Sequence, residues 1–128
     1  SLTSVDVSNF NTSKTISITY LFKGCSSLSS IDISNFDTKN VYTMSFAFAD
    51  CKLIASLNLT NFDTNKVNNL YGIFSGCTSL THLYIDSFNT TNVNQFASMF
   101  ENCHSLTSLD ISHFDTKNAK SYFYMFNN

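Results

Sequence analysis

The sequence predicts an α/β solenoid, a right-handed coil of five 26-residue repeats that each carry a short parallel strand and a short helix. The first observation is a column of cysteines at 26-residue steps: Cys25, Cys51, Cys77 and Cys103. The second is that two columns of phenylalanine and one of threonine keep the same step without insertion or deletion. The third is a change within each repeat from an apolar period of two to one of three to four, which favours a strand followed by a helix. We therefore expect one uncapped array of coils, at residues 2–27, 28–53, 54–79, 80–105 and 106–128.

The strand is predicted from the alternation Ser30-Ile31-Asp32-Ile33-Ser34 in the second coil. Two aliphatic side chains fall on one face and three small polar ones on the other, which is typical of a half-buried strand. The equivalent aliphatic pairs of the other coils are Val5/Val7, Leu57/Leu59, Leu83/Ile85 and Leu109/Ile111. We expect the strands of adjacent coils to pair in parallel, about 4.8 Å apart.

The helix is predicted from Val41, Met44, Phe48 and Cys51, which are three or four residues apart and would share one helix face. Its end is indicated by residue types that tolerate the left-handed conformation of a helix C′ position. These residues are Gly24, Asp50, Gly76, Asn102 and Asn128. Its start is indicated by an Asp or Asn directly before each threonine of the column, and either member of the pair could cap the free N–H groups.

These patterns resemble a known family. The pattern L-x-x-L-x-L-x-x-F-[DN]-T at residues 28–38, followed by F-x-G-C-x-S-L as at residues 74–80, is similar to the 26-residue repeat of bacterial surface proteins. That family is known as the BspA-like leucine-rich repeats and also occurs in mycoplasma lipoproteins. The resemblance covers the whole chain. It implies a leucine-rich-repeat-like solenoid outside the cell, in proteins described as adhesive or of unknown role, and it supplies no catalytic residue.

Composition and charge exclude several classes of function. A net charge of −2, with only 12% charged residues, gives no basic surface for nucleic acid. No apolar run approaches the ~18 residues of a membrane span. His82, His104 and His113 occupy different columns of the coil and cannot converge on a nucleophile. We expect a protein that is not an enzyme and has no cofactor.

The cysteine and aspartate columns also have structural explanations. Each coil contributes one thiol to a line, whereas zinc needs ligands that converge on one point, so buried free thiols are expected. A disulfide such as Cys25–Cys51 remains the alternative. Asp6 and Asp32 share a column and could hold calcium between coils, but the chain lacks the closely spaced acids of known calcium loops. We assign no metal site, and turn and cap roles account for a second acidic pair, Asp37 and Asp63.

The outward positions of the strands contain the candidate contact site. They read Ser-Asp-Ser in most coils but His82, Tyr84 and Asp86 in the fourth. These three residues are our candidate partner contact, because exposed tyrosine is favoured at interfaces. The competing interpretation is drift at tolerant surface positions.

Three N-x-S/T sequons are candidate glycosylation sites, at Asn11, Asn58 and Asn89. A chain this rich in Asn, Ser and Thr contains some sequons through composition alone. They matter only in a host and compartment with N-glycosylation.

The function expected is that of a non-catalytic repeat module, extracellular or at the cell surface, for adhesion or scaffolding. Its partner would be a protein or glycan at a surface, or further copies of the same repeat. The alternative is a structural subunit that stacks end to end into an extracellular filament. The chain ends are a separate observation: the sequence begins in mid-coil, stops at Asn128 in the correct phase for another repeat, and has no polar cap. We therefore expect a segment of a longer array or a filament.

Overall fold

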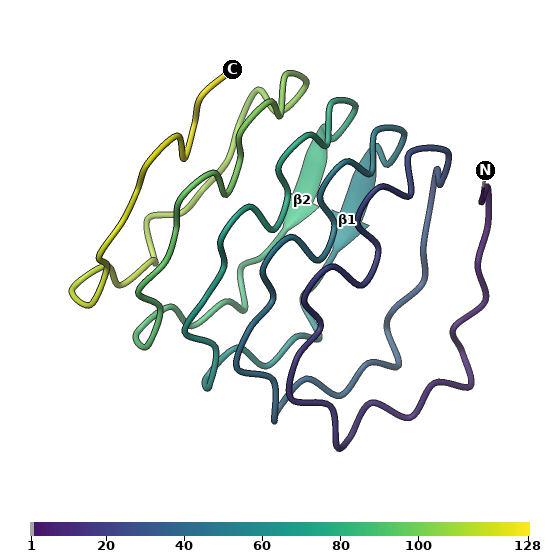
Figure 1. Ribbon diagram of the computed structural model, residues 1–128, viewed down its shortest axis with the longest axis horizontal. Coiled ribbons are helices and arrows are strands. Elements are labelled where there is room, and N and C mark those ends of the chain that lie inside the picture. Colours follow the sequence, from purple (N-terminus) through teal and green to yellow (C-terminus); the bar gives the residue numbers. More distant parts are fainter. Residues whose placement is uncertain (1) are drawn as a thin grey trace.

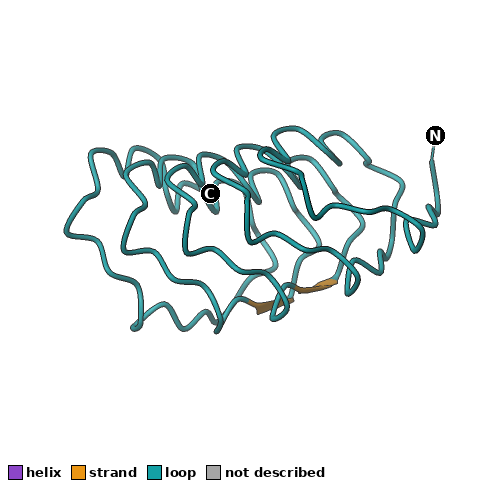
Figure 2. Cartoon of the chain, turned by 90° about the horizontal axis from the view of Figure 1, so that it is seen from below, coloured by secondary structure: helices purple, strands orange, loops and turns teal. Residues whose placement is uncertain are grey.

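The chain winds into a stack of coils, seen in the computed structural model, which describes residues 2–128 (Figure 1). We number the coils 1 to 5 by the residue ranges given above. Coils 3 and 4 contain the strands β1 (Ser56–Asn58) and β2 (His82–Tyr84), which pair in parallel with Leu57 opposite Leu83. On another side of the coils, single parallel bridges join one column through the whole stack: Ser17, Thr43, Asn69, Gln95 and Ser121. Turns and loops make up most of the described chain (Figure 2).

The predicted α/β class is wrong, because residues 2–128 form no helix and only two short strands. In the segment expected to be helical in coil 2, residues 41–51, Thr43 forms a bridge and residues 45–50 are turns. The N–H groups of Phe46 and Phe48 donate to the carbonyl oxygens of Tyr71 and Ile73 in coil 3, at 2.9 and 3.0 Å. The N–H groups of Ala47 and Ala49, which alternate with them, close turns within coil 2. In an α-helix every one of these groups would bond within its own segment.

Left-handed backbone conformations explain why no helix forms. The positions predicted to be left-handed have positive φ in four coils: Gly24 (76°), Asp50 (59°), Gly76 (74°) and Asn102 (57°). A second left-handed column lies four residues earlier: Tyr20 (61°), Phe46 (54°), Gly72 (57°), Ser98 (55°) and Tyr124 (56°). An α-helix needs consecutive right-handed residues, so this second column interrupts the helix in its middle. The sequence did not indicate this second column, because several of its residues are aromatic and bulky side chains rarely adopt positive φ.

The core lies inside the coils, and most of it was predicted. Ile33, Phe36, Met44 and Phe48 are each no more than 4% exposed, although Ile31 is half-buried. The phenylalanines of one column stack from coil to coil, with ring centroids 5.6, 6.1, 5.8 and 5.5 Å apart along Phe22, Phe48, Phe74, Phe100 and Phe126. The three inner rings, Phe48, Phe74 and Phe100, thus bury their faces against the coils above and below. Burial of this kind is the main stabilising term of a stacked repeat.

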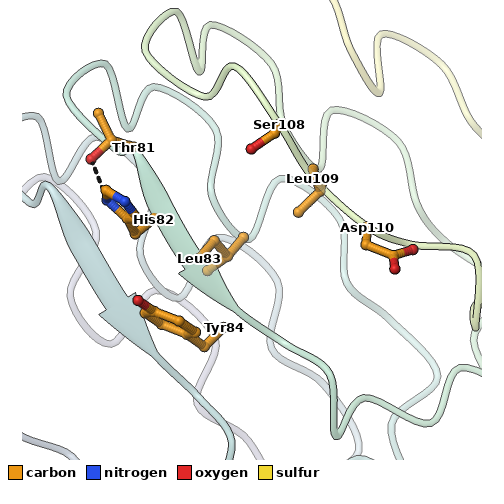
Figure 3. Close-up of a pocket in the computed structure, with 7 residues that line it drawn as sticks. All are labelled: Thr81, His82, Leu83, Tyr84, Ser108, Leu109 and Asp110. Carbon is orange, nitrogen blue, oxygen red and sulfur yellow. Dashed lines mark hydrogen bonds between the residues drawn. The ribbon is translucent and has the colours of Figure 1, made fainter.

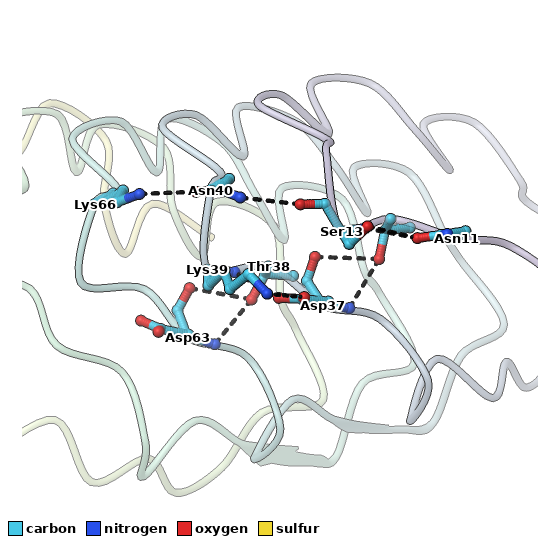
Figure 4. A network of polar contacts seen from close by, with 9 residues as sticks. Asn11, Ser13, Asp37, Thr38, Lys39, Asn40, Asp63 and Lys66 are labelled. Atoms are coloured by element: carbon cyan, nitrogen blue, oxygen red, sulfur yellow. Dashed lines mark hydrogen bonds and ion pairs between the residues drawn. The ribbon is translucent and has the colours of Figure 1, made fainter.

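Side-chain columns supply further hydrogen bonds between coils. The Thr38 hydroxyl donates to the Asp63 carbonyl oxygen at 3.0 Å and accepts from the Asp63 N–H at 2.8 Å (Figure 4). Thr12 and Thr64 make the same pair of bonds to the next coil. We call this column the threonine ladder. The Asx-Thr pairs therefore do not cap helices: the threonine joins coils, while the Asp37 carboxylate accepts from the Lys39 N–H two residues on.

A second column, of asparagine side chains and the residues that replace them, also forms hydrogen bonds between adjacent coils. The Asn61 Nδ2 donates to carbonyl oxygens of Ile33, Ser34 and Phe36 in the coil before, at 3.1–3.3 Å. Ser87 takes the position in coil 4, and its hydroxyl reaches two of the equivalent carbonyls, those of Leu59 and Phe62, at 3.3 and 3.5 Å. The residues that recur in every coil are thus largely occupied in holding the stack together. Positions that depart from the recurring pattern are the ones to search for function.

Candidate functional site

An open groove of about 420 Å³ lies between coils 4 and 5 on the side that carries the strands (Figure 3). One wall is β2 with the preceding Thr81, and the other is the segment 108–110 of coil 5. The lining residues are Thr81, His82, Leu83, Tyr84, Ser108, Leu109 and Asp110. Within residues 2–128, β2 pairs with β1 on one side only, and no backbone hydrogen bond joins it to 108–110. We call this space the coil 4–5 groove.

The orientation of His82 is fixed by its neighbour. The Thr81 hydroxyl lies 2.9 Å from His82 Nδ1 and 2.9 Å from the Ala55 carbonyl oxygen. The contact with Nδ1 orients the ring and leaves Nε2 for a ligand. In the neutral imidazole one nitrogen donates and the other accepts, so the tautomer decides which role Nε2 takes.

Asp110 contributes a carboxylate on the opposite wall. Its Oδ1 accepts from the Ser112 N–H at 2.9 Å. Hydrogen bonds from the Ser112 side chain and then from its backbone lower the pKa of the Asp110 carboxyl below its usual value. The group is consequently ionised at neutral pH and acts only as an acceptor.

Tyr84 interrupts a structural column. In the other coils, the residue at this position accepts a hydrogen bond from the N–H two residues on and so closes a turn. The pairs are Asp6 with Ser8, Asp32 with Ser34, Asn58 with Thr60 and Asp110 with Ser112. A tyrosine side chain cannot reach back in this way, and Tyr84 is instead 44% exposed. Coil 4 has therefore replaced a turn-closing side chain by an exposed aromatic ring.

The structure brings together two of the three residues of the candidate partner contact. His82 and Tyr84 line the coil 4–5 groove, whereas Asp86 is exposed outside the lining. The acid in the groove is Asp110, together with Ser108. Sequence reasoning had assigned both residues to the ordinary strand face of coil 5. They stand one repeat after Tyr84 and His82, so the 26-residue step would have found them.

The sequon asparagines are all exposed, and Asn58 is the last residue of β1. Each side-chain Oδ1 accepts from the N–H two residues on, at 3.0–3.1 Å, in Asn11, Asn58 and Asn89. Asn89 also donates from Nδ2 to the Asn65 Oδ1 at 2.7 Å. Its amide nitrogen is thus more restrained than those of the other two sequons.

The cysteines are free thiols with structural contacts. Cys51, Cys77 and Cys103 are buried, and each donates to a carbonyl oxygen of the preceding coil at 3.1–3.2 Å. Burial raises the pKa of Cys51 to about 12 and that of Cys103 to about 11. Cys25 is half-buried. A thiol held neutral in this way is a poor nucleophile and a poor metal ligand.

Neither the acids nor the histidines gather into a second site. Asp6 and Asp32 each close a turn by accepting from the N–H two residues on. Residues 2–128 contain no group of three or more His, Cys, Asp or Glu residues that could hold a metal ion. His104 is exposed, and the His113 Nε2 lies 3.3 Å from the Ile85 carbonyl oxygen, in the position that asparagine occupies in coils 2 and 3.

The recurring columns and the bonds between coils define a repeat protein. The family model described as "Mycoplasma protein of unknown function, DUF285" matches residues 2–56 and 42–128, and the chain belongs to this family. The two matched stretches overlap, as a repeated unit allows. Searches of curated proteins and of solved structures gave no match. Over the described residues, the chain contains no helix of the length and hydrophobicity that crossing a membrane requires.

Proposed function

We propose that this chain is a non-catalytic repeat module, extracellular or at the cell surface, that mediates adhesion or scaffolding. The observation that carries the proposal is that some columns of the coil hold the stack together, whereas others stay exposed at the surface. Buried apolar columns and the threonine ladder hold the coils together. The outward strand positions stay exposed, and in coils 4 and 5 they border an open groove.

The chemistry of the outward positions suits recognition at a surface. Ser, Asp and Asn side chains offer hydrogen-bond donors and acceptors without an apolar patch that would aggregate. Tyr84 adds the exposed aromatic ring that interfaces favour. The resemblance to BspA-like repeats supports the location outside the cell, and a protein or glycan at a surface is the partner proposed.

Labelling and adhesion experiments together test this proposal. An antibody against the chain should label intact, unpermeabilised cells that produce it, and brief protease treatment of those cells should remove the label. Beads coated with the purified chain should be retained on surfaces coated with host cells or extracellular matrix, in a saturable manner. Labelling only after permeabilisation, or retention no greater than that of beads coated with albumin, would refute the proposal.

A second candidate is a structural subunit that stacks end to end into a filament. It is favoured by the exposure of phenylalanines in coils 1 and 5, where Phe10 and Phe126 are 53% and 57% exposed, against 2% for Phe62 in coil 3. A further coil in the same phase, from the same chain or from a second copy, would cover them. Sedimentation velocity at increasing concentration should then give larger species for the native chain and not for a Phe10→Ser, Phe126→Ser variant. A native chain that stays monomeric would exclude this candidate.

A further inference from the structure

We propose that the coil 4–5 groove binds a neutral saccharide, with a sugar ring stacked on Tyr84 and its hydroxyl groups bonded to Asp110 and His82. This inference specifies the partner of the surface module proposed above and rests on that proposal. The groove volume of about 420 Å³ falls within the ~300–1,000 Å³ typical of small-molecule sites. The two walls come from different coils, so the site exists only when coils 4 and 5 are stacked (Figure 3).

The groove combines an aromatic ring with aliphatic side chains. Tyr84 is 44% exposed, and each wall contributes one half-buried leucine, Leu83 from β2 and Leu109 from the segment 108–110 (Figure 3). A sugar ring has C–H groups on its faces and hydroxyl groups around its edge. An exposed tyrosine offers such a ring an apolar face with little loss of conformational entropy on binding. A purely polar ligand, such as an inorganic ion, would make no use of these side chains.

The polar groups of the groove offer acceptors for hydrogen bonds. Asp110 is ionised, with its pKa lowered by Ser112, and accepts hydrogen bonds only. The His82 Nε2 accepts or donates according to the tautomer of the ring, whose Nδ1 contacts the Thr81 hydroxyl. Sugar hydroxyls supply the donors that these groups need, and the Ser108 hydroxyl can serve in either role. No Lys or Arg lines the groove, and the Asp110 charge would repel a carboxylate or sulfate. The ligand inferred is therefore neutral.

The repeat itself provides an internal control against a structural explanation of Tyr84. Coils 1, 2 and 5 have aspartate in this column and coil 3 has asparagine, and each of these side chains closes a turn. Some exposed aromatic residues pack on other rings, as Tyr20 stacks on Phe46 at 5.5 Å, whereas the exposed Tyr42 and Phe10 have no ring partner among the described residues. In the part of the chain described, Tyr84 has no such ring contact. The substitution thus gives up a stabilising hydrogen bond and gains an exposed ring at the wall of a groove.

Saturation-transfer NMR and calorimetric titration of the whole purified chain test the inference. The probes are the methyl glycosides of glucose, galactose, mannose and N-acetylglucosamine, with N-acetylneuraminate as the acidic comparison. At least one neutral glycoside should bind saturably, and N-acetylneuraminate should bind at least ~10-fold more weakly, because Asp110 repels it. If no neutral glycoside binds, or if the acidic sugar binds best, the inference is overturned.

Each variant replaces a residue by the one that occupies the equivalent position in other coils. Tyr84→Asp restores the residue of coils 1, 2 and 5 together with its turn-closing bond, so it should fold, and it should weaken binding at least ~10-fold. Tyr42→Asn is the matched control: Tyr42 is 47% exposed, Asn68 and Asn94 occupy its column in the next two coils, and affinity should not change. Equal affinity of native chain and Tyr84→Asp would overturn the inference.

The second variant, Asp110→Asn, keeps the turn-closing oxygen and removes only the charge. It should weaken neutral-sugar binding several-fold and reduce the discrimination against N-acetylneuraminate. Because it changes neither the ring nor the turn, it tests the groove even if Tyr84→Asp fails to fold. Unchanged affinity and unchanged discrimination would contradict the assigned role of Asp110.

The same beads used for the adhesion test separate this inference from the proposed function. If native and Tyr84→Asp chains adhere equally, and periodate oxidation of surface glycans has no effect, the saccharide inference fails and the surface module stands. If the native chain binds a neutral glycoside but its beads adhere to no surface, the groove is supported and the adhesive function fails. Loss of adhesion in Tyr84→Asp and after periodate supports both.

Discussion

Replacing Thr64 by valine removes one rung of the threonine ladder and leaves the shape of the core nearly unchanged. The Thr64 hydroxyl donates to the Asn89 carbonyl oxygen at 3.1 Å and accepts from the Asn89 N–H at 2.7 Å. Thr64 is 1% exposed, so the valine side chain occupies the same buried space. The experiment therefore measures the two hydrogen bonds between coils 3 and 4 rather than a cavity.

The expected loss follows from these two bonds. Each contributes about 0.5–1.5 kcal/mol net, and the Asn89 N–H left without its partner beside the core adds about 1 kcal/mol. Thr64→Val should thus lower the free energy of unfolding by about 2–4 kcal/mol. Urea unfolding followed by far-ultraviolet circular dichroism measures this as a lower midpoint with an unchanged m-value.

Thr116→Val is the matched control. Thr116 occupies the same column in coil 5, is exposed, and its hydroxyl has no hydrogen-bond partner among the described residues. The control should change stability by less than about 0.5 kcal/mol. Equal losses for the two variants, or a Thr64→Val loss below about 0.5 kcal/mol, would show that the threonine ladder does not stabilise the stack.

Two further predictions concern the glycines and the thiols. Gly24→Ala and Gly76→Ala both place a side chain at positive φ (76° and 74°), which costs about 1–2 kcal/mol. The added Cβ meets nothing within 4 Å at Gly24 but lies 2.5 Å from the Asp50 Oδ1 at Gly76, so Gly76→Ala should melt at the lower temperature; equal melting temperatures would contradict this. The folded-state pKa values of Cys51 and Cys103, about 12 and 11, lie above the ordinary value of 9.0. Their contribution to stability is therefore complete below about pH 9 and lost as pH rises toward 11–12, seen as a falling urea midpoint. At pH 8 both thiols should react with a thiol reagent only as fast as the protein unfolds, and immediate reaction of the native protein would refute this.

The repeating unit and most of its core could be predicted from the sequence. A 26-residue step that returns the same residue type, as with Phe36 and Phe62, requires equivalent environments one coil apart, and both are buried at 4% and 2% exposure. The left-handed position of Asp50 and Asn102 was equally predictable. Only a few residue types tolerate positive φ, so a column of Gly, Asp and Asn carries that information locally.

The predicted helix was wrong because the apolar spacing on which it rested fits both a helix and a series of tight turns. Val41, Met44, Phe48 and Cys51 are spaced as on one face of a helix, but successive turns of three to four residues bury side chains at the same spacing. The contrary signal was hidden at Phe46, where an aromatic residue adopts positive φ and donates its N–H to coil 3. Whether a backbone N–H group bonds within its own segment or to the next coil depends on which carbonyl oxygens the tertiary structure places beside it.

The groove likewise depended on tertiary structure. His82 and Tyr84 were identifiable because they depart from their columns, and departure from a repeat is a property of sequence. That the acid beside them is Asp110 rather than Asp86 follows from the way coils 4 and 5 stack without pairing their strands. The sequence by itself determined the period, the inward columns and the exceptional coil. The tertiary structure decided the hydrogen-bond partners and the opening between coils, because both depend on contacts between residues about 26 positions apart.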